Sequence, residues 1–356
     1  MIPQNFQKLL QTVLGMALCC SLAGCTSTNP ADDKTDLSSS KQSSLTSQTP
    51  SETGRNEGSL SSSADNEKIL MECDTADSLE KLTLTDDLNR TVEFKRPQRI
   101  AVLIGSFADE LANAGGKDLI VAAAHDTWTQ FDLDLENAAD LGDVKNISTE
   151  ALIDSQPDLV IASAKNDSQR KMKETLDNAG IPVLYFDVDS FEDYLRTLNA
   201  MTRITGDCQA YQTNGLNQQK AIEEIRNQTP DKELKVLALR ETGKGVKALG
   251  SENSLLGQML ADLHTQNIAG EGGLDTLSME TVQIENPDAI FYVAQGKDNE
   301  TAQKMAEKLF RQDAWKDLNA VKEGRVYVLD QKLYNLKPNA KWAQALADLG
   351  NLVYGQ

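Results

Sequence analysis

Two segments of the chain share one pattern: STEALIDSQPDLVI occupies residues 148–161, and SMETVQIENPDAIF occupies residues 278–291. In each segment a Ser stands before a short helical stretch with Glu near its start, which is typical of a helix N-terminus. A Pro-Asp turn follows, and then an apolar run that is typical of a buried strand. The same helix–turn–strand unit therefore occurs twice, which predicts two related lobes.

Strand-like apolar runs alternate with helical segments on both sides of these units. The predicted strands are residues 99–104, 119–122, 158–162, 183–186, 234–239, 289–293 and 325–329. The predicted helices are residues 107–114, 169–179, 255–263, 301–310 and 339–354. Alternation of this kind implies parallel βα units. We therefore expect an α/β fold of two Rossmann-like lobes, each with a central, mostly parallel sheet.

Two further segments complete the predicted organisation. Residues 82–94 form alternating runs around a polar turn, which indicates a β-hairpin. Residues 208–228 lack a strand pattern and place Leu216, Ile222 and Ile225 at roughly helical spacing before Pro230, which predicts one long helix joining the lobes. The predicted divisions are residues 1–24, a signal peptide; 25–78, a tether; 79–206, the N-terminal lobe; 207–230, the linking helix; and 231–356, the C-terminal lobe.

The N-terminus predicts export. Lys8 is the only charge before an apolar run that is too short to span a bilayer comfortably, so it indicates a signal peptide. The run closes with Leu-Ala-Gly-Cys at residues 22–25, which resembles the bacterial lipobox. We therefore expect lipid on Cys25 and a lipid-anchored protein on the extracytoplasmic face of the cell membrane. The alternative is a plain secretory signal with an incidental cysteine.

The segment after Cys25 is predicted to be a disordered tether. Residues 26–66 contain 18 Ser or Thr in 41 positions and no aromatic residue. Such a segment buries too little surface to offset its chain entropy.

Cys73 and Cys208 are able to form a disulfide in the expected extracytoplasmic compartment, and the sequence leaves their pairing open.

Charge and composition exclude several functions. With 54 acidic against 35 basic residues, the formal charge is −19, which argues against nucleic-acid binding. The chain has two histidines, no zinc-type CxxC cluster and no GxSxG nucleophile motif, so we expect neither an enzyme nor a bound cofactor or metal. A receptor for bare zinc or manganese ions is disfavoured too, because such sites use several His with carboxylates.

The chain resembles the class III substrate-binding proteins of ABC importers, which receive ferric siderophores, haem or cobalamins. The matching segments run from about Leu82 to the C-terminus; they are residues 99–103, 141–143, 150–161, 179–183, 204–206 and 315–327. The resemblance implies two lobes joined by one rigid helix, with a metal chelate held in the cleft between them. It also implies that the chain delivers this chelate to an ABC permease and its ATPase. We expect the chain to be a monomer.

Candidate ligand contacts follow from where the predicted strands end, because open α/β sheets bind ligands at the carboxyl ends of their strands. The candidates in the loops at these ends are Phe107, Trp128, Lys165, Arg240, Ser251 and Tyr334. Trp128 is suited to stack on a flat ligand, or it is a loop anchor packed on the core. Arg240 is suited to pair with a carboxylate or catecholate oxygen, or it is part of a surface ion pair.

The resemblance further implies one exposed Glu near the top of each lobe, which meets an arginine pocket on the permease. Glu150 and Glu280 occupy the matching positions. The alternative is that each is a favourable acid in the first turn of a helix.

The predicted function is therefore capture and delivery of a metal chelate. The alternatives are a surface sensor or adhesin on the same scaffold, or a bare metal-ion receptor.

Overall fold

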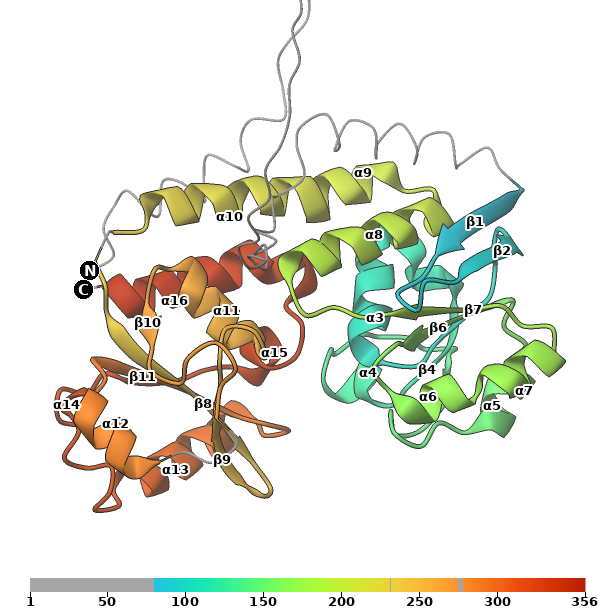
Figure 1. The fold of residues 1–356 in the computed structure, drawn as a ribbon. Helices are drawn as coiled ribbons and strands as arrows, with labels where there is room; N and C mark the ends of the chain where they lie inside the picture. Colours follow the sequence, from blue (N-terminus) through green and yellow to red (C-terminus); the bar gives the residue numbers. More distant parts are fainter. Residues whose placement is uncertain (1–79, 231, 275–277, 356) are drawn as a thin grey trace, which may run out of the picture. The chain divides into compact units, whose positions relative to one another are not determined.

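The computed structural model describes residues 80–230, 232–274 and 278–355, all within one unit that spans Leu60–Gly355 (Figure 1). The predicted signal peptide, Cys25, Cys73 and the predicted tether lie outside the described residues. Every helix in the described ranges is too short or too polar to cross a membrane.

The first lobe contains a five-stranded parallel sheet with the strand order β5-β4-β3-β6-β7. Its strands are β3 (Ile100–Val102), β4 (Ile120–Ala123), β5 (Ala139–Asp140), β6 (Leu159–Ser163) and β7 (Val183–Phe186). An antiparallel hairpin of β1 (Lys81–Thr85) and β2 (Thr91–Lys95) precedes the sheet. The helical segments are α3 (Gly105–Leu111), η1 (Ala112–Gly116), η2 (Lys117–Leu119), α4 (Asp126–Thr129), α5 (Thr149–Asp154), α6 (Asp167–Lys171), α7 (Lys173–Asn178) and α8 (Phe191–Thr205).

The second lobe contains a sheet with the order β10-β8-β11-β12, whose strands are parallel, and β9 pairs antiparallel with β8. Its strands are β8 (Lys235–Thr242), β9 (Gly245–Ala248), β10 (Gln266–Asn267), β11 (Ala289–Ala294) and β12 (Val326–Val328). Its helical segments are α11 (Leu255–Asp262), α12 (Met279–Glu285), α13 (Asn299–Phe310), α14 (Asn319–Lys322), α15 (Gln331–Tyr334), η4 (Asn339–Lys341) and α16 (Trp342–Tyr354). The predicted fold class is confirmed.

The segment between the two sheets is helical from α9 (Cys208–Tyr211) through η3 (Gln212–Leu216) to α10 (Asn217–Gln228). The π-helical turn η3 lies against α8 at Gly215, where a Cβ atom would come within 3.1 Å of Leu195 Cδ2. Glycine therefore allows the two helices to approach closely. Cys208, at the start of this segment, is disulfide-bonded.

The repeated unit has the same local structure in both lobes. Ser148 and Ser278 are the N-caps of α5 and α12, and each hydroxyl accepts a hydrogen bond from the N–H three residues later. In each copy the Asp that follows the proline accepts backbone N–H groups at the start of the neighbouring strand: Asp158 from Arg99 at 3.0 Å, and Asp288 from Lys235 at 3.0 Å. These carboxylates attach the end of each short helix to the sheet.

A hydrophobic core connects α8 with the C-terminal helix α16. The Trp342 ring lies 5.5 Å from Phe191 and 6.0 Å from Tyr194. Just before α16, the buried Asn339 amide donates to Ser106 O at 3.0 Å and to Asp109 Oδ2 at 2.7 Å. The last segment of the chain therefore packs on the first lobe through both apolar and polar contacts.

Several local features differ from the predictions. The predicted helix over residues 169–179 is divided into α6 and α7 around Met172. The 15-residue helix α8 and the antiparallel strand β9 were not predicted. The Gly243-Lys244-Gly245 segment connects β8 to β9, and Gly245 has a φ of 124°, a conformation that favours glycine.

Candidate functional site

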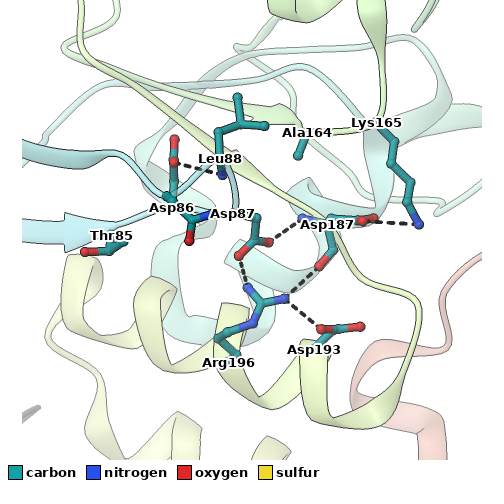
Figure 2. Close-up of a pocket in the computed structure, with 10 residues that line it drawn as sticks. Thr85, Asp86, Asp87, Leu88, Ala164, Lys165, Asp187, Asp193 and Arg196 are labelled. Carbon is teal, nitrogen blue, oxygen red and sulfur yellow. Dashed lines mark hydrogen bonds and ion pairs between the residues drawn. The ribbon is translucent and has the colours of Figure 1, made fainter. Parts of the chain in front are cut away.

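A cavity of about 630 Å³ lies at the carboxyl ends of β6 and β7 in the first lobe (Figure 2). Its volume is within the range of small-molecule sites. Its lining residues are Thr85, Asp86, Asp87, Leu88, Asn89, Ala164, Lys165, Asp187, Asp193 and Arg196. The cavity therefore includes Lys165, one of the predicted ligand contacts.

Lys165 lies between two carboxylates in this cavity. Its Nζ atom is 3.1 Å from Asp187 Oδ2 and also contacts Asp189. Partial burial opposes the charge, but the hydrogen bonds to Asp189 and Asp187 hold the pKa of Lys165 above its ordinary value. Burial raises the pKa of Asp187, although the Lys165 ammonium counteracts this effect. The Lys165 side chain is more than half exposed, so a ligand is able to reach it.

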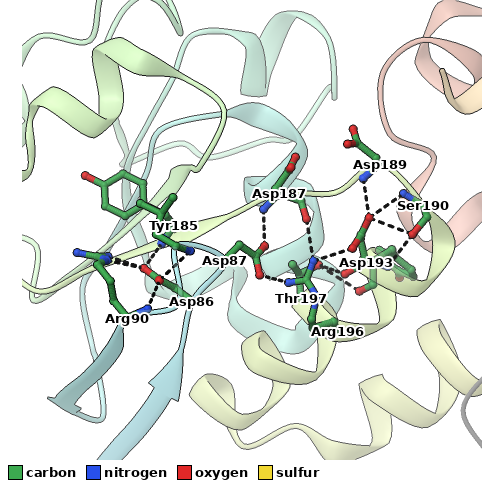
Figure 3. A network of polar contacts seen from close by, with 12 residues as sticks. Asp86, Asp87, Arg90, Tyr185, Asp187, Asp189, Ser190, Asp193, Arg196 and Thr197 are labelled. Atoms are coloured by element: carbon green, nitrogen blue, oxygen red, sulfur yellow. Dashed lines mark hydrogen bonds and ion pairs between the residues drawn. The ribbon is translucent and has the colours of Figure 1, made fainter. Parts of the chain in front are cut away.

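Arg196 of α8 organises the opposite side of the cavity (Figure 3). Its guanidinium donates to Asp87, to Asp193 Oδ1 at 2.8 Å and to Asp187 O at 3.0 Å. Asp193 also forms the capping box of α8 with Ser190. Although burial acts in the opposite direction, hydrogen bonds from Arg196, Asp189 N–H and Ser190 hold the pKa of Asp193 low.

An ion pair between the buried Asp86 carboxylate and the partly exposed Arg90 fixes the hairpin that borders the cavity. Asp86 accepts from Arg90 Nε at 3.0 Å, from Leu88 N at 3.1 Å and from Tyr185 N at 3.2 Å. The Arg90 guanidinium lies 4.7 Å from the centroid of the Tyr185 ring, a cation–π distance. Asp86 and Arg90 thus attach the β1–β2 turn to β7. This structural role accounts for a charged residue at each of the two positions.

A smaller cavity of about 260 Å³ lies at the carboxyl end of β4, next to His125 and Asp126. His125 Nδ1 is 2.7 Å from Asp140 Oδ2, and Gly105 N–H donates to Asp126 Oδ1 at 2.9 Å. Trp128 follows in α4, where its half-buried ring packs against the hydrophobic core. The ring therefore serves as a loop anchor while keeping part of its surface accessible.

A polar cavity of about 270 Å³ lies at the carboxyl end of β8 in the second lobe. Arg240 and Lys247, on the paired strands β8 and β9, line it together with Asn253. The Arg240 guanidinium donates to Asn335 Oδ1 at 3.4 Å, while its buried Nε has no hydrogen-bond partner among the described residues. The cavity therefore offers the Arg240 guanidinium as a charged hydrogen-bond donor to a ligand oxygen. Ser251 is half-buried in the adjoining loop and does not line this cavity.

Two predicted contacts are buried. Phe107 is only 4% exposed in α3, and its ring packs edge-on against Phe186 at 6.1 Å. Tyr334 is 5% exposed in α15, and its hydroxyl donates to Ala345 O at 2.9 Å. In this structure both rings contribute to packing, and neither offers an open surface. The reason is that helices begin within the predicted loops and direct these side chains into the core.

The loops at the carboxyl ends of strands also meet across the lobes. The Gln331 amide donates to Gln130 Oε1 at 3.2 Å and to Lys297 O at 2.9 Å. Beside it, Lys332 Nζ forms an ion pair with Asp132. None of these residues is among the candidates predicted from the sequence, because the partners of Gln130 and Asp132 lie some 200 residues away.

Glu150 and Glu280 are exposed in the first turns of α5 and α12. Among the described residues, neither carboxylate has an ion-pair or hydrogen-bond partner through its side chain.

No group of three His, Cys, Asp or Glu side chains in the described ranges is arranged to hold a metal ion.

Comparisons with known proteins match this architecture. The model of the periplasmic binding protein family matches residues 100–333. YvrC of Bacillus subtilis, an uncharacterized ABC transporter substrate-binding lipoprotein, is 24% identical over 286 residues, covering 77% of this chain and 85% of YvrC.

Two solved structures share the fold. The haem-binding protein HutB of Vibrio cholerae has a TM-score of 0.62 at 20% identity, covering 72% of this chain and 99% of HutB. The petrobactin-binding protein YclQ of Bacillus subtilis has a TM-score of 0.59 at 20% identity, covering 77% of this chain and 98% of YclQ. Proteins of this family are non-enzymatic parts of importers that also include a permease and an ATPase. The chain thus belongs to the periplasmic binding protein family, as a class III substrate-binding protein of an ABC importer.

Proposed function

We infer that the chain captures a metal chelate, a ferric siderophore, haem or a cobalamin, in a cleft between its lobes and delivers it to an ABC permease. The family and the polar loops at the carboxyl ends of the strands support this proposal. A chelated metal already has its ligands, so the protein needs only aromatic surface and charged hydrogen-bond donors around the chelate. We propose that Trp128, Lys165, Arg240 and Ser251 supply these contacts.

The cavity at Arg240 is the observation that carries the proposal. It brings together two cationic side chains, Arg240 and Lys247, on the paired strands β8 and β9. A carboxylate or catecholate oxygen of a chelate would form a charge-assisted hydrogen bond with the Arg240 guanidinium. We therefore assign the anionic edge of the ligand to the second lobe.

Substituting Arg240 tests this assignment. Arg240→Gln should weaken binding of the preferred chelate by about tenfold or more, because a hydrogen bond to a charged group contributes about 1.5–3 kcal/mol. The measurement is the quenching of tryptophan fluorescence during titration with a ferric catecholate, a ferric hydroxamate, haem and cyanocobalamin. Lys244→Gln is the matched control, because it removes the same charge from the β8–β9 turn outside the cavity. Equal affinities for the two variants would place the anionic edge elsewhere.

We also propose that the chain is anchored by lipid on Cys25 and held away from the membrane by the segment of residues 25–78. The lipobox-like sequence supports this anchor, and YvrC is itself named a lipoprotein. Cys25→Ser should release the chain from washed membranes into the soluble fraction, since no acyl chain then enters the bilayer. Membrane retention of this variant after a high-salt wash would contradict the anchor.

The proposed delivery step uses Glu150 and Glu280 as contacts for cations on the permease. Their exposure on equivalent helices of the two lobes supports this role. Two carboxylates on separate lobes would allow the permease to recognise the lobe spacing of the receptor.

A further inference from the structure

Each helix that carries a proposed docking glutamate also exposes an isoleucine. Ile153 of α5 is 38% exposed, and Ile284 of α12 is 74% exposed. The other exposed large apolar side chains of the described residues are Leu88 and Leu274, and each of these lines a cavity. Ile284 is thus the large apolar side chain with the greatest exposure in the described part of the chain and lines none of the cavities described above.

The spacing places each isoleucine beside its glutamate. Residues three or four positions apart share one side of a helix, and Ile153 follows Glu150 by three positions. Ile284 follows Glu280 by four positions, which gives the same neighbourhood on the second helix. The opposite sides of the two helices hold Leu152 and Val282, which are buried against the sheets.

An exposed carboxylate alone gives weak docking, because a solvated ion pair contributes little. An apolar contact next to such a pair excludes water and so strengthens the electrostatic attraction. Single exposed apolar side chains are normal on protein surfaces, but here one accompanies the proposed docking glutamate on both helices, which favours a surface that becomes covered in a complex.

We propose that the permease surface that docks this chain carries, beside each cation that meets Glu150 or Glu280, an apolar recess that receives Ile153 or Ile284. This inference rests on the proposed docking role of the glutamates and specifies the chemistry of the partner surface. The two contacts are unequal: Ile284 enters deeply, whereas the less exposed Ile153 contributes less. The position matching Ile284 in the first lobe is Asp154, so the two helices are not interchangeable in the complex.

The test is the dissociation constant of the full chain for the permease–ATPase complex in nanodiscs, measured without cargo. Ile284→Ser should weaken docking about tenfold, whereas Ile284→Leu, which keeps the apolar surface, should dock like the wild type. Ile153→Ser should have a smaller effect. Gln303→Ser, on the exposed surface of α13, is the control and should change nothing. Because Ile284 is largely exposed, its substitution leaves the core intact.

The outcomes separate this inference from the docking role itself. If Ile284→Ser docks like the wild type and Glu280→Ala docks weakly, the apolar recess is refuted, whereas the glutamate contacts are not. Wild-type docking by both variants would overturn the docking surface as a whole. Equal weakening by Ile284→Ser and Ile284→Leu would also contradict an apolar recess that accepts either side chain.

Discussion

Replacing Glu110 with glutamine is expected to stabilise the chain at pH 8 and to remove much of its loss of stability between pH 5 and pH 8. Glu110 lies in α3, fully buried, with its carboxyl hydrogen-bonded to Thr197 of α8. Burial raises its pKa from the ordinary value of 4.5 to about 8. The nearby charge of Asp109 raises the pKa further, whereas Thr197, Arg196 and Lys337 lower it.

The direction of the pH effect follows from the raised pKa. Below pH 4.5 the carboxyl is protonated in both the folded and the unfolded chain, so it imposes no penalty. Between 4.5 and about 8 the unfolded chain ionises first, and the free energy of unfolding falls as the pH rises. At about 1.4 kcal/mol per pKa unit, the full penalty above pH 8 is on the order of 5 kcal/mol.

Glutamine keeps the shape of the side chain and cannot ionise, so it avoids this penalty. Because its amide still requires hydrogen-bond partners in the core, we expect a net gain of about 2–3 kcal/mol at pH 8. Urea unfolding at pH 5 and pH 8 measures the difference. Burial also raises the pKa of Asp109, but that residue is present in both proteins and its effect cancels. An identical loss of stability in both proteins would show that Glu110 ionises normally.

The second large effect is expected from the double substitution Glu150→Ala and Glu280→Ala, which should abolish uptake. Losing one member of a closely packed interfacial charge pair weakens binding by about 2–5 kcal/mol, so two independent losses together reduce docking by about a thousandfold or more. Ligand affinity should stay unchanged, because both residues lie outside the cavities described above.

The matched control is Glu174→Ala with Glu300→Ala. These two glutamates are also exposed in the first turns of helices, α7 and α13. The control therefore loses the same charge and the same favourable interaction with the helix dipole, about 0.3–1 kcal/mol at each site. Normal uptake by the exported Glu150/Glu280 variant, or equal defects in both double variants, would refute the docking role.

The sequence predicted those parts of the fold that are encoded locally. The Ser caps, Pro-Asp turns and apolar runs of the two repeated segments are all short-range signals, and both units form as expected. Helix α8 has such a signal too, the capping box of Ser190 and Asp193, which would have indicated its start. Strand β9 was missed because its four residues, Gly245–Ala248, are too few to show a clear alternation, and antiparallel pairing with β8 determines their conformation.

The site was less predictable, because its geometry depends on long-range packing. Loop position selected Lys165 and Arg240 as candidate ligand contacts, and in the structure each of them lines a cavity. It gave no information on side-chain direction, so Phe107 and Tyr334 were included although both rings are buried. The contact of Gln130 with Gln331 joins residues 201 positions apart, and no periodic pattern encodes such a pair.

Equilibrium titration of the purified full chain determines whether it binds a chelated metal. The panel consists of a ferric catecholate, a ferric hydroxamate, haem and cyanocobalamin, with uncomplexed zinc and manganese ions as controls. We predict saturable one-to-one binding of one chelate class, weakened by Arg240→Gln, and no comparable binding of the free ions. Tight binding of a free ion with no response to any chelate would contradict this prediction.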